Sequence, residues 1–376
     1  MIDFQKLPSP CFVLDEQLLD RNLAVIDRVR RESGAEVIVA LKACAMWSIF
    51  PELAQHSDGA TASSLAEARL VFEEFGGPAH TYAPVYTDRN IEEILDCSDH
   101  ITFNSVAQFE RFGQMALLRG ISCGLRINPG YSPVETDLYN PCVPGSRLGI
   151  PAGELKELPA GVEGLHFHVL CESRPEHLRL ALDAVEERFG RFLDRIKWLN
   201  MGGGHLMTHK DYDCDELIRI LQEFKAKYPN LRLILEPGSA FTWRTGYLVS
   251  TVEDIVENGG VRTAMLDVSF ACHMPDCLEM PYKPAILGAR DPEPGEKGWR
   301  MGGNSCLAGD YYGDWIFDRD LRVGDRIVFE DMIHYTMVKT TMFNGVAHPA
   351  IAIVRRDGAI EIIREFGYED FKSRMS

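Results

Sequence analysis

The sequence predicts a (β/α)8 barrel of the TIM type, joined to a C-terminal all-β domain. Over roughly the first 240 of its 376 residues, eight short apolar runs alternate with amphipathic stretches, as in a parallel barrel wrapped by helices. After about Phe241 the long helical patterns stop, and short strand-like runs separated by turns such as Asn258-Gly259-Gly260 follow. We therefore expect a barrel domain over 15–240 and a β-sandwich or β-barrel domain over 241–376, which an N-terminal strand within 1–14 joins.

The eight expected barrel strands are rich in β-branched and apolar residues. They are Glu36–Leu41, Gly59–Ala62, His80–Ala83, His100–Phe103, Cys123–Ile127, Gly164–Val169, Lys197–Met201 and Arg232–Leu235. The expected helices are Glu16–Arg31, Ser48–Gln55, Ser64–Phe75, Asp88–Leu95, Ser105–Leu118, Pro175–Phe189 and Asp215–Lys227. Ser63–Ser64 and Asn104–Ser105 offer N-caps. The helix after the fifth strand is poorly marked, and Asn128–Gly149 predicts a long functional loop instead.

The second domain is expected to consist of shorter strands. They are Tyr247–Val256, Thr263–Asp267, Arg326–Phe329, Tyr335–Thr341, Ile351–Arg355 and Glu361–Arg364. The segment Cys11–Leu14 precedes the barrel, and we expect it to pair with these strands.

The composition restricts the binding partners and the cellular compartment that we expect for this protein. The formal net charge of −17 argues against nucleic-acid binding, which needs a basic face, and is compatible with a cationic small substrate. No signal peptide and no stretch long enough to span a bilayer is recognisable. Ten scattered cysteines without a Cys-x-x-Cys pair are typical of reduced thiols, so a cytoplasmic protein is expected.

Three polar motifs follow expected strands, at the end of a barrel where chemistry is usually found. Lys42 ends the first strand, Gly202-Gly203-Gly204 the seventh and Glu236 the eighth. A lysine can form a Schiff base with pyridoxal 5′-phosphate (PLP), glycines let backbone N–H groups approach a phosphate, and a carboxylate can keep the pyridine nitrogen protonated. Each motif alone also fits a plain role: a surface lysine, a glycine turn without ligand, or a rim carboxylate paired with Arg126.

Two histidines end the sixth strand and point to the same face, because side chains alternate along a strand. His168 could stack on an aromatic cofactor ring, although a hydrogen-bonded barrel histidine is the commoner role. The pair His166 and His168 lacks a completing carboxylate or cysteine, and the spacing of Cys272 and Cys277 matches no standard zinc motif. No metal is therefore expected. In the second domain, Cys306 is either a buried small hydrophobe or a proton donor, with Asp310 placed to bind a substrate amine.

Taken together, these motifs resemble the PLP-dependent decarboxylases of the alanine-racemase fold type, which include ornithine, arginine and diaminopimelate decarboxylases. The resemblance covers nearly the whole chain. In the barrel, the matching motifs are Lys42 in Ala40-Leu41-Lys42-Ala43, His168 in Phe167-His168-Val169, Gly202–Gly204 and Glu236-Pro237-Gly238. In the second domain, Cys306 and Asp310 match residues that a partner subunit contributes, and Tyr335 matches a phosphate-binding tyrosine. The resemblance thus implies a homodimer with shared active sites.

The chain departs from ornithine and diaminopimelate decarboxylases at two positions. Ser239 replaces an arginine after Glu-Pro-Gly, and Leu170-Cys171 replaces Gly-Ser after the histidine motif. With Met201–His205 and His273–Tyr282, these features are similar to the carboxynorspermidine and carboxyspermidine decarboxylases of polyamine biosynthesis.

This resemblance implies a mechanism in which Lys42 holds the cofactor, Glu236 keeps its ring protonated and Cys306 protonates Cα after loss of CO2. Asp267, Glu279 and Asp310 are the expected partners of the substrate's cationic amines. Three alternatives stay open: a decarboxylase for diaminopimelate, ornithine or arginine, an amino-acid racemase, and a non-catalytic PLP-binding protein. The candidate acids and Ser239 argue against a decarboxylase for one of these amino acids. Glu236 argues against a racemase, because racemases place arginine at the pyridine nitrogen. The β domain that carries Cys306 speaks against the third.

Overall fold

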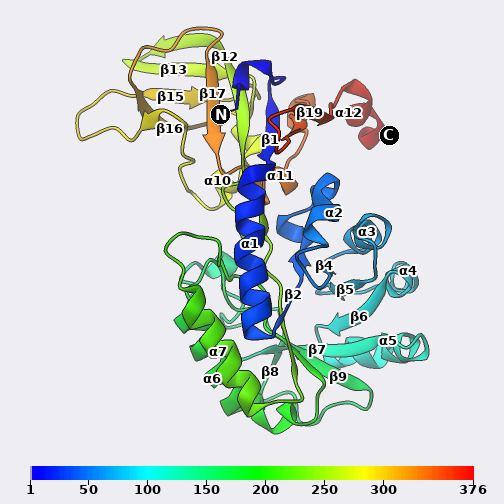
Figure 1. Cartoon of the computed structure of the whole chain (residues 1–376). Coiled ribbons are helices and arrows are strands. Elements are labelled where there is room, and N and C mark those ends of the chain that lie inside the picture. The colour runs from blue at the N-terminus through cyan, green and yellow to red at the C-terminus, as the bar shows by residue number, and fades with distance from the viewer. Residues whose placement is uncertain (1) are drawn as a thin grey trace. The chain divides into compact units, whose positions relative to one another are not determined.

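A parallel sheet that closes on itself forms the centre of the unit Asn22–Phe241 in the computed structural model, which describes residues 2–376 (Figure 1). Its hydrogen-bonded order is β2-β11-β10-β9-β7-β6-β5-β4-β3. The strands are β2 (Glu36–Val37), β3 (Val39–Ala40), β4 (Ala60–Ala62), β5 (Ala79–Tyr82), β6 (Ser98–Phe103), β7 (Ser122–Asn128), β9 (Val162–His166), β10 (Trp198–Asn200) and β11 (Arg232–Leu235). Because β2 and β3 are successive pieces of one expected strand, the order closes into the predicted eight-stranded barrel.

Large side chains fill the interior of this barrel. Ile38, Trp198 and Ile234 form a buried cluster. Glycine is required opposite the indole, since a Cβ at Gly164 would lie 2.0 Å and one at Gly124 2.2 Å from the Trp198 ring. The barrel is therefore a packed core, and polar chemistry is confined to its two ends.

The barrel helices follow the predicted pattern closely. They are α1 (Glu16–Ser33), α2 (Phe50–Leu53), α3 (Leu65–Leu70), α4 (Ile91–Asp96), α5 (Val106–Leu118), α6 (Pro175–Leu193), α7 (Cys214–Lys227) and α8 (Ser239–Thr242). The predicted caps are confirmed, because Ser64 accepts a hydrogen bond from Glu67 N and Ser105 one from Gln108 N. Between β7 and β9 the chain runs as a long loop with only a short strand, β8 (Ile150–Pro151), and one 3-10 turn, Asp137–Tyr139.

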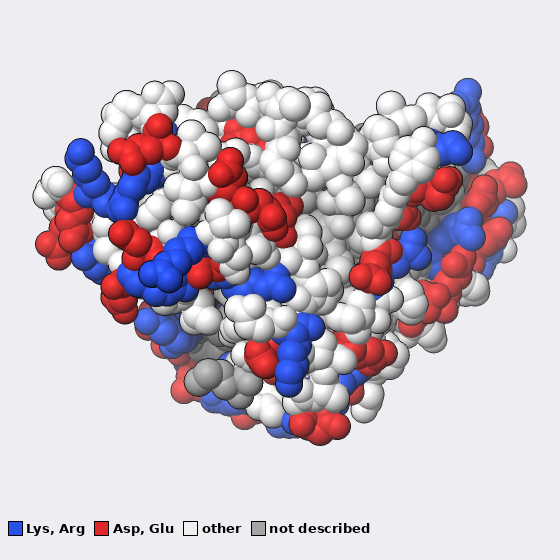
Figure 2. Space-filling model, turned by 90° about the horizontal axis from the view of Figure 1, so that it is seen from above, with Lys and Arg blue, Asp and Glu red and all other residues white. Residues whose placement is uncertain are grey.

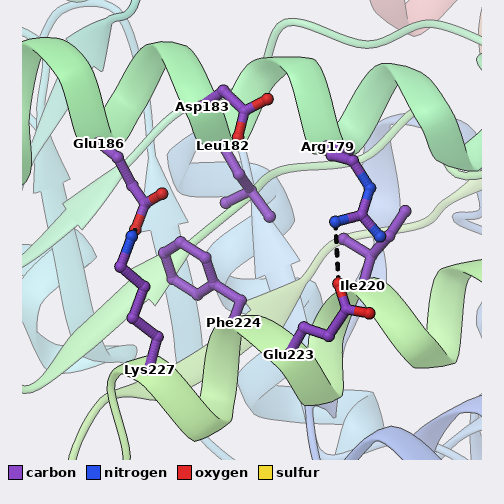
Figure 3. Close-up of a pocket in the computed structure, with 8 residues that line it drawn as sticks. All are labelled: Arg179, Leu182, Asp183, Glu186, Ile220, Glu223, Phe224 and Lys227. Atoms are coloured by element: carbon purple, nitrogen blue, oxygen red, sulfur yellow. Dashed lines mark hydrogen bonds and ion pairs between the residues drawn. The ribbon is translucent and has the colours of Figure 1, made fainter.

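Helices α6 and α7 pack side by side on the outside of the barrel, and Figure 3 shows the shallow groove between them. Leu182, Ile220 and Phe224 line its floor. Ion pairs close both ends: Arg179 to Glu223 at 2.9 Å and Lys227 to Glu186 at 2.5 Å. Both cations of the groove are thus paired within the chain, and the groove is the seam between two packed helices.

The second unit comprises Met1–Arg21 and Thr242–Ser376 and is built on a mostly antiparallel sheet. Its order is β14-β16-β15-β13-β12-β1-β18-β19, with β17 on β12. The strands are β1 (Cys11–Asp15), β12 (Gly246–Asn258), β13 (Val261–Leu266), β14 (Ala289–Arg290), β15 (Trp299–Gly302), β16 (Tyr311–Phe317), β17 (Arg326–Glu330), β18 (Ala350–Val354) and β19 (Ile360–Arg364). The N-terminal strand joins it as predicted, because β1 pairs with both β12 and β18.

This unit is not purely β. It also contains α9 (Phe270–His273), α10 (Pro275–Glu279), α11 (Tyr335–Val338) and α12 (Tyr368–Met375). The predicted strand Tyr335–Thr341 is wrong, since α11 occupies its first half. Local β propensity is overridden there by a tertiary contact: Thr336 is fully buried, and its hydroxyl donates to Asp276 of α10 at 2.8 Å.

The face in Figure 2 carries acidic and basic side chains interspersed, without a continuous basic patch. Among residues 2–376, no helix combines the length and the apolar character needed to cross a membrane. All ten cysteines are free.

Candidate active site

Four of the predicted site motifs meet at the carboxyl end of the barrel strands. Lys42 lies in a 3-10 turn directly after β3, His168 two residues after β9, the glycines Gly202–Gly204 after β10, and Glu236 directly after β11. Because β9, β10, β11 and β2 are consecutive neighbours in the sheet, the turns that follow them open at the same rim. Parallel pairing thus brings together residues nearly 200 positions apart.

Lys42 and His168 are in direct contact. The Lys42 Nζ lies 3.1 Å from the His168 Nε2, and the His168 Nδ1 accepts the backbone N–H of Gly203 at 3.1 Å. Burial and the adjacent Lys42 lower the pKa of His168 well below its ordinary value, so the ring is neutral. A neutral ring whose Nδ1 accepts carries its proton on Nε2, the nitrogen that faces the Lys42 amine.

The surroundings of Lys42 lower the pKa of its amine. Burial lowers it, against the opposing effect of the Glu236 carboxylate, and Arg126 lowers it further. An amine with a lowered pKa has a larger neutral fraction at physiological pH, and only the neutral amine is a nucleophile. Lys42 therefore has the electrostatic setting that a Schiff-base lysine needs.

Glu236 is held as a carboxylate in a largely buried position, with 13% of its side chain exposed. The Asn200 amide donates to its Oε1 at 2.6 Å, and the His166 Nε2 lies 3.8 Å from its Oε2. Burial alone would raise its pKa, but His166, Asn200 and Lys42 together hold the pKa below the ordinary value. An anion fixed in this way is suited to hold a protonated ring nitrogen.

Arg126 does not take the role of a partner to Glu236. Its guanidinium donates to the backbone carbonyl of His168 at 3.2 Å and lies over the Tyr82 ring, 4.7 Å from its centroid. Arg126 instead fixes the turn that carries His168.

The glycine turn is shaped so that side chains are excluded. Gly202 and Gly204 have φ of +69° and +93°, which L residues rarely adopt. A Cβ at Gly203 would lie 2.4 Å from the Glu236 carbonyl oxygen, and one at Gly204 2.3 Å from that of Leu170. The N–H groups of Gly202 and Gly203 bond Asn200 and His168. The lysine and the ionised carboxylate at one rim fit the aldehyde and the ring nitrogen of PLP, and the glycine turn beside them is the candidate to face its phosphate.

Sequence reasoning missed Asn200, which connects two of the predicted motifs. Its side-chain nitrogen donates to Glu236, and its Oδ1 accepts the N–H of Gly202 at 2.9 Å. A signal was available, because Asn200 is the polar residue within the otherwise apolar run Trp198–Met201.

In the second unit, Cys306 and Asp310 lie in one loop between β15 and β16. Cys306 is exposed, and its backbone N–H donates to Asn344 at 2.8 Å. Asp310 is buried and accepts two backbone N–H groups, one from Ala271 and one from Ser305, both at 3.0 Å. Asp310 therefore shapes the loop that presents Cys306.

The other predicted residues of this unit have varied surroundings. Tyr335 begins α11, half-buried against His334. Glu279 is exposed and pairs with Lys339 at 2.5 Å. Both oxygens of Asp267 accept hydrogen bonds, from Ser9, Ser250 and Thr251.

Asp276 is a buried acid of the loop Cys272–Tyr282. Its Oδ2 accepts hydrogen bonds from Tyr282 and Thr336, whereas its Oδ1 is buried without a partner among residues 2–376. Such an unsatisfied buried oxygen marks a place where a ligand donor would be stabilising.

The known proteins that this chain resembles are decarboxylases. Residues 11–333 match the family model described as pyridoxal-dependent decarboxylase, C-terminal sheet domain. The chain is 54% identical to a carboxyaminopropylagmatine decarboxylase from Synechocystis sp., covering 98% of this chain and 96% of that protein. It is 40% identical to a carboxynorspermidine/carboxyspermidine decarboxylase from Campylobacter jejuni, with 99% of both proteins covered. The crystal structure of carboxynorspermidine decarboxylase complexed with norspermidine from Campylobacter jejuni superposes with a TM-score of 0.90 at 38% identity, covering 98% of this chain and 100% of that one.

Proposed function

This chain belongs to the pyridoxal-dependent decarboxylase family, and we propose that it removes the α-carboxyl group from a carboxylated polyamine such as carboxynorspermidine or carboxyspermidine. The product is then norspermidine or spermidine, and the step belongs to polyamine biosynthesis. The observation that carries the proposal is the group Lys42, His168 and Glu236 at one rim of the barrel, in a chain 40% identical over its full length to enzymes named for these substrates.

Each residue of the rim has a defined task in this reaction. When bound, PLP supplies the electron sink for the pair of electrons left by the departing CO2. Lys42 would hold the cofactor covalently, and His168, 3.1 Å from the Lys42 Nζ, would keep that amine in position. Glu236, fixed by Asn200, would keep the proton on the ring nitrogen, and Gly202–Gly204 are proposed to hold the phosphate.

The second unit supplies the groups that meet the substrate. The exposed thiol of Cys306 delivers a proton to Cα after CO2 leaves. We propose Asp310, Glu279 and Asp267 as the carboxylates nearest to the polyamine cations, and we add Asp276, because its Oδ1 still lacks a donor. Tyr335 is proposed to bind the phosphate. Charge-assisted hydrogen bonds of this kind both bind and orient a flexible cation.

A second substrate is favoured by one specific observation, the 54% identity to a relative named for carboxyaminopropylagmatine. Agmatine ends in a guanidinium group where norspermidine ends in a primary amine. A guanidinium presents a planar fork of donors that pairs with a carboxylate through two parallel hydrogen bonds. The two substrates therefore share the reacting end and differ in the distal group.

We further propose a cytoplasmic homodimer whose active sites are shared between subunits. The ten free cysteines support a reducing compartment. The match of Cys306 and Asp310 to residues that a partner subunit contributes in similar decarboxylases supports the sharing of sites.

Product analysis of the purified enzyme tests the function. The panel should contain carboxynorspermidine, carboxyspermidine, carboxyaminopropylagmatine, ornithine, lysine and diaminopimelate, with CO2 release and amine products measured. We expect efficient turnover of at least one of the first three and poor turnover of the short diamino acids. Comparable kcat/KM on ornithine or diaminopimelate would refute the polyamine proposal while leaving the family assignment intact.

A further inference from the structure

The opposite end of the barrel carries a cluster of metal-ligating side chains that the decarboxylase site does not use. His80 lies at the start of β5, and Asp99 and His100 lie at the start of β6. One ligand atom from each of these three residues lies within 4.8 Å of the others. Lys42 and Glu236 follow the carboxyl ends of their strands, whereas these residues stand at the amino ends.

A β-bulge brings the three side chains together. In the parallel pairing of β5 with β6, Ala79 is opposite Ser98 and His80 is opposite His100, so Asp99 is the extra residue. In regular pairing, Asp99 and His100 would point to opposite faces of the sheet. A bulge re-aims the inserted side chain, and here it turns the Asp99 carboxylate toward both imidazoles.

The distances are close to those of a coordination sphere. The His100 Nδ1 lies 2.8 Å and the His80 Nε2 3.8 Å from the Asp99 Oδ1. Tetrahedral Zn²⁺ with bonds of about 2.0–2.2 Å holds its ligand atoms roughly 3.4 Å apart, between these two values. The two rings are stacked, with centroids 3.9 Å apart and an angle of 23° between their planes, so binding one ion requires a rotation of an imidazole as well as small shifts.

The protonation states also suit a cation. Burial, together with the neighbouring His100, lowers the pKa of His80 to about 4, so the His80 imidazole is neutral at physiological pH. Burial would raise the pKa of Asp99, but His100 and His80 hold it below the ordinary value. The His80 Nε2 lies 3.8 Å from the Asp99 Oδ1, which is too far for a hydrogen bond, so this nitrogen is not committed to the carboxylate.

The neighbouring charges do not oppose a bound cation. Arg232 lies close enough to interact with Asp99, yet its guanidinium donates to both carboxylate oxygens of Glu36 at 2.7 Å. Asp99 therefore adds net negative charge to this end of the barrel. Its side chain is 49% exposed, whereas the two imidazoles are 12% and 13% exposed. A metal could thus enter from solvent past the carboxylate and reach both rings.

We propose that His80, Asp99 and His100 form a structural site for a divalent transition metal, with Zn²⁺ as the representative ion, that cross-links β5 to β6. Two imidazoles and one carboxylate are ligands that such ions prefer, and water would fill the remaining position. The site is independent of the proposed decarboxylase function.

Isothermal titration of the PLP-loaded enzyme with Zn²⁺ tests this proposal. Besides the wild type, it needs His80→Gln and Asp99→Asn, which each remove one ligand. His56→Gln is the matched control, because His56 pairs with Asp27 at 2.6 Å in a surface pair outside the cluster. We expect one Zn²⁺ per chain in the wild type and the control, and at least roughly tenfold weaker binding in the two cluster variants.

Two further readouts keep the test decisive if a cluster variant folds poorly. Zn²⁺ at a hundredfold excess over Kd should raise the melting temperature of the wild type by about 3 °C, and Co²⁺ should give the visible absorption of a nitrogen- and oxygen-ligated site. Wild-type enzyme that binds no Zn²⁺ at millimolar concentration would overturn the proposal. So would unchanged Zn²⁺ affinity in both His80→Gln and Asp99→Asn, which would identify the cluster as a polar plug of the barrel.

Discussion

Replacing Glu236 by glutamine removes one negative charge from the rim while leaving the shape of the side chain nearly unchanged. The carboxylate is held ionised by its surroundings, with the Asn200 amide 2.6 Å from Oε1. Its proposed task is to accept a hydrogen bond from a protonated ring nitrogen. A hydrogen bond to a charged group contributes about 1.5–3 kcal/mol, roughly twice that of a neutral pair.

The size of the effect follows from the loss of that charged hydrogen bond. If the pyridinium depends on Glu236, losing about 1.5–3 kcal/mol from the decarboxylation transition state slows kcat by roughly 10- to 150-fold. The cofactor should stay bound, because Lys42 and the glycine turn are intact. The assay is single-turnover CO2 release at equal PLP occupancy, quantified from the cofactor's absorbance.

The matched control is Glu163→Gln. Glu163 belongs to β9 but pairs with Lys197 at the other end of the barrel. This variant should decarboxylate at the wild-type rate. Turnover by Glu236→Gln that equals the control at equal PLP occupancy would refute the role of Glu236 at the ring nitrogen.

Three further predictions concern the cofactor, the assembly and pH. Lys42→Ala should lose the visible absorbance of the bound cofactor and nearly all turnover, and a purified variant that keeps both would contradict the assignment. Mixing inactive Lys42→Ala with inactive Cys306→Ala should restore up to roughly a quarter of wild-type activity, because half of randomly assembled dimers are hybrids with one intact site; no recovery after verified subunit exchange would mean that each chain is self-sufficient. Burial lowers the pKa of His205 to about 4. Between pH 6.5 and about 4 the unfolded chain therefore binds one more proton at this residue, and the free energy of unfolding falls with decreasing pH by up to about 1.4 kcal/mol per pH unit. His205→Gln should flatten that dependence in denaturant titrations, and an unchanged slope would count against a neutral buried His205.

Much of the barrel could be predicted from the sequence, because the patterns that mark its strands and helices are local. Each strand is a short apolar run, and Ser64 and Ser105 mark helix starts by the chemistry of their own hydroxyl groups. The same holds for the rim, because residues that directly follow parallel strands share one end of the barrel. Lys42 and Glu236 could therefore be grouped before any distance was known.

The remaining features depend on tertiary contacts that no local pattern encodes. Residues Tyr335–Val338 are helical because the buried Thr336 reaches Asp276, although their β-branched content favours a strand. Likewise, strand register with a bulge at Asp99 brings His80 to His100, and residue spacing along one strand could not predict that pairing.

The central claim is that this chain decarboxylates a carboxylated polyamine. The most direct test measures kcat/KM of the PLP-loaded wild type on carboxynorspermidine, carboxyspermidine and carboxyaminopropylagmatine against ornithine and diaminopimelate, under one set of conditions. Several cationic groups on a long substrate can pair with several acids at once, and each pair orients Cα, so we expect the best polyamine substrate to exceed both short diamino acids by at least roughly a hundredfold. An equal or higher kcat/KM on either diamino acid would contradict the claim.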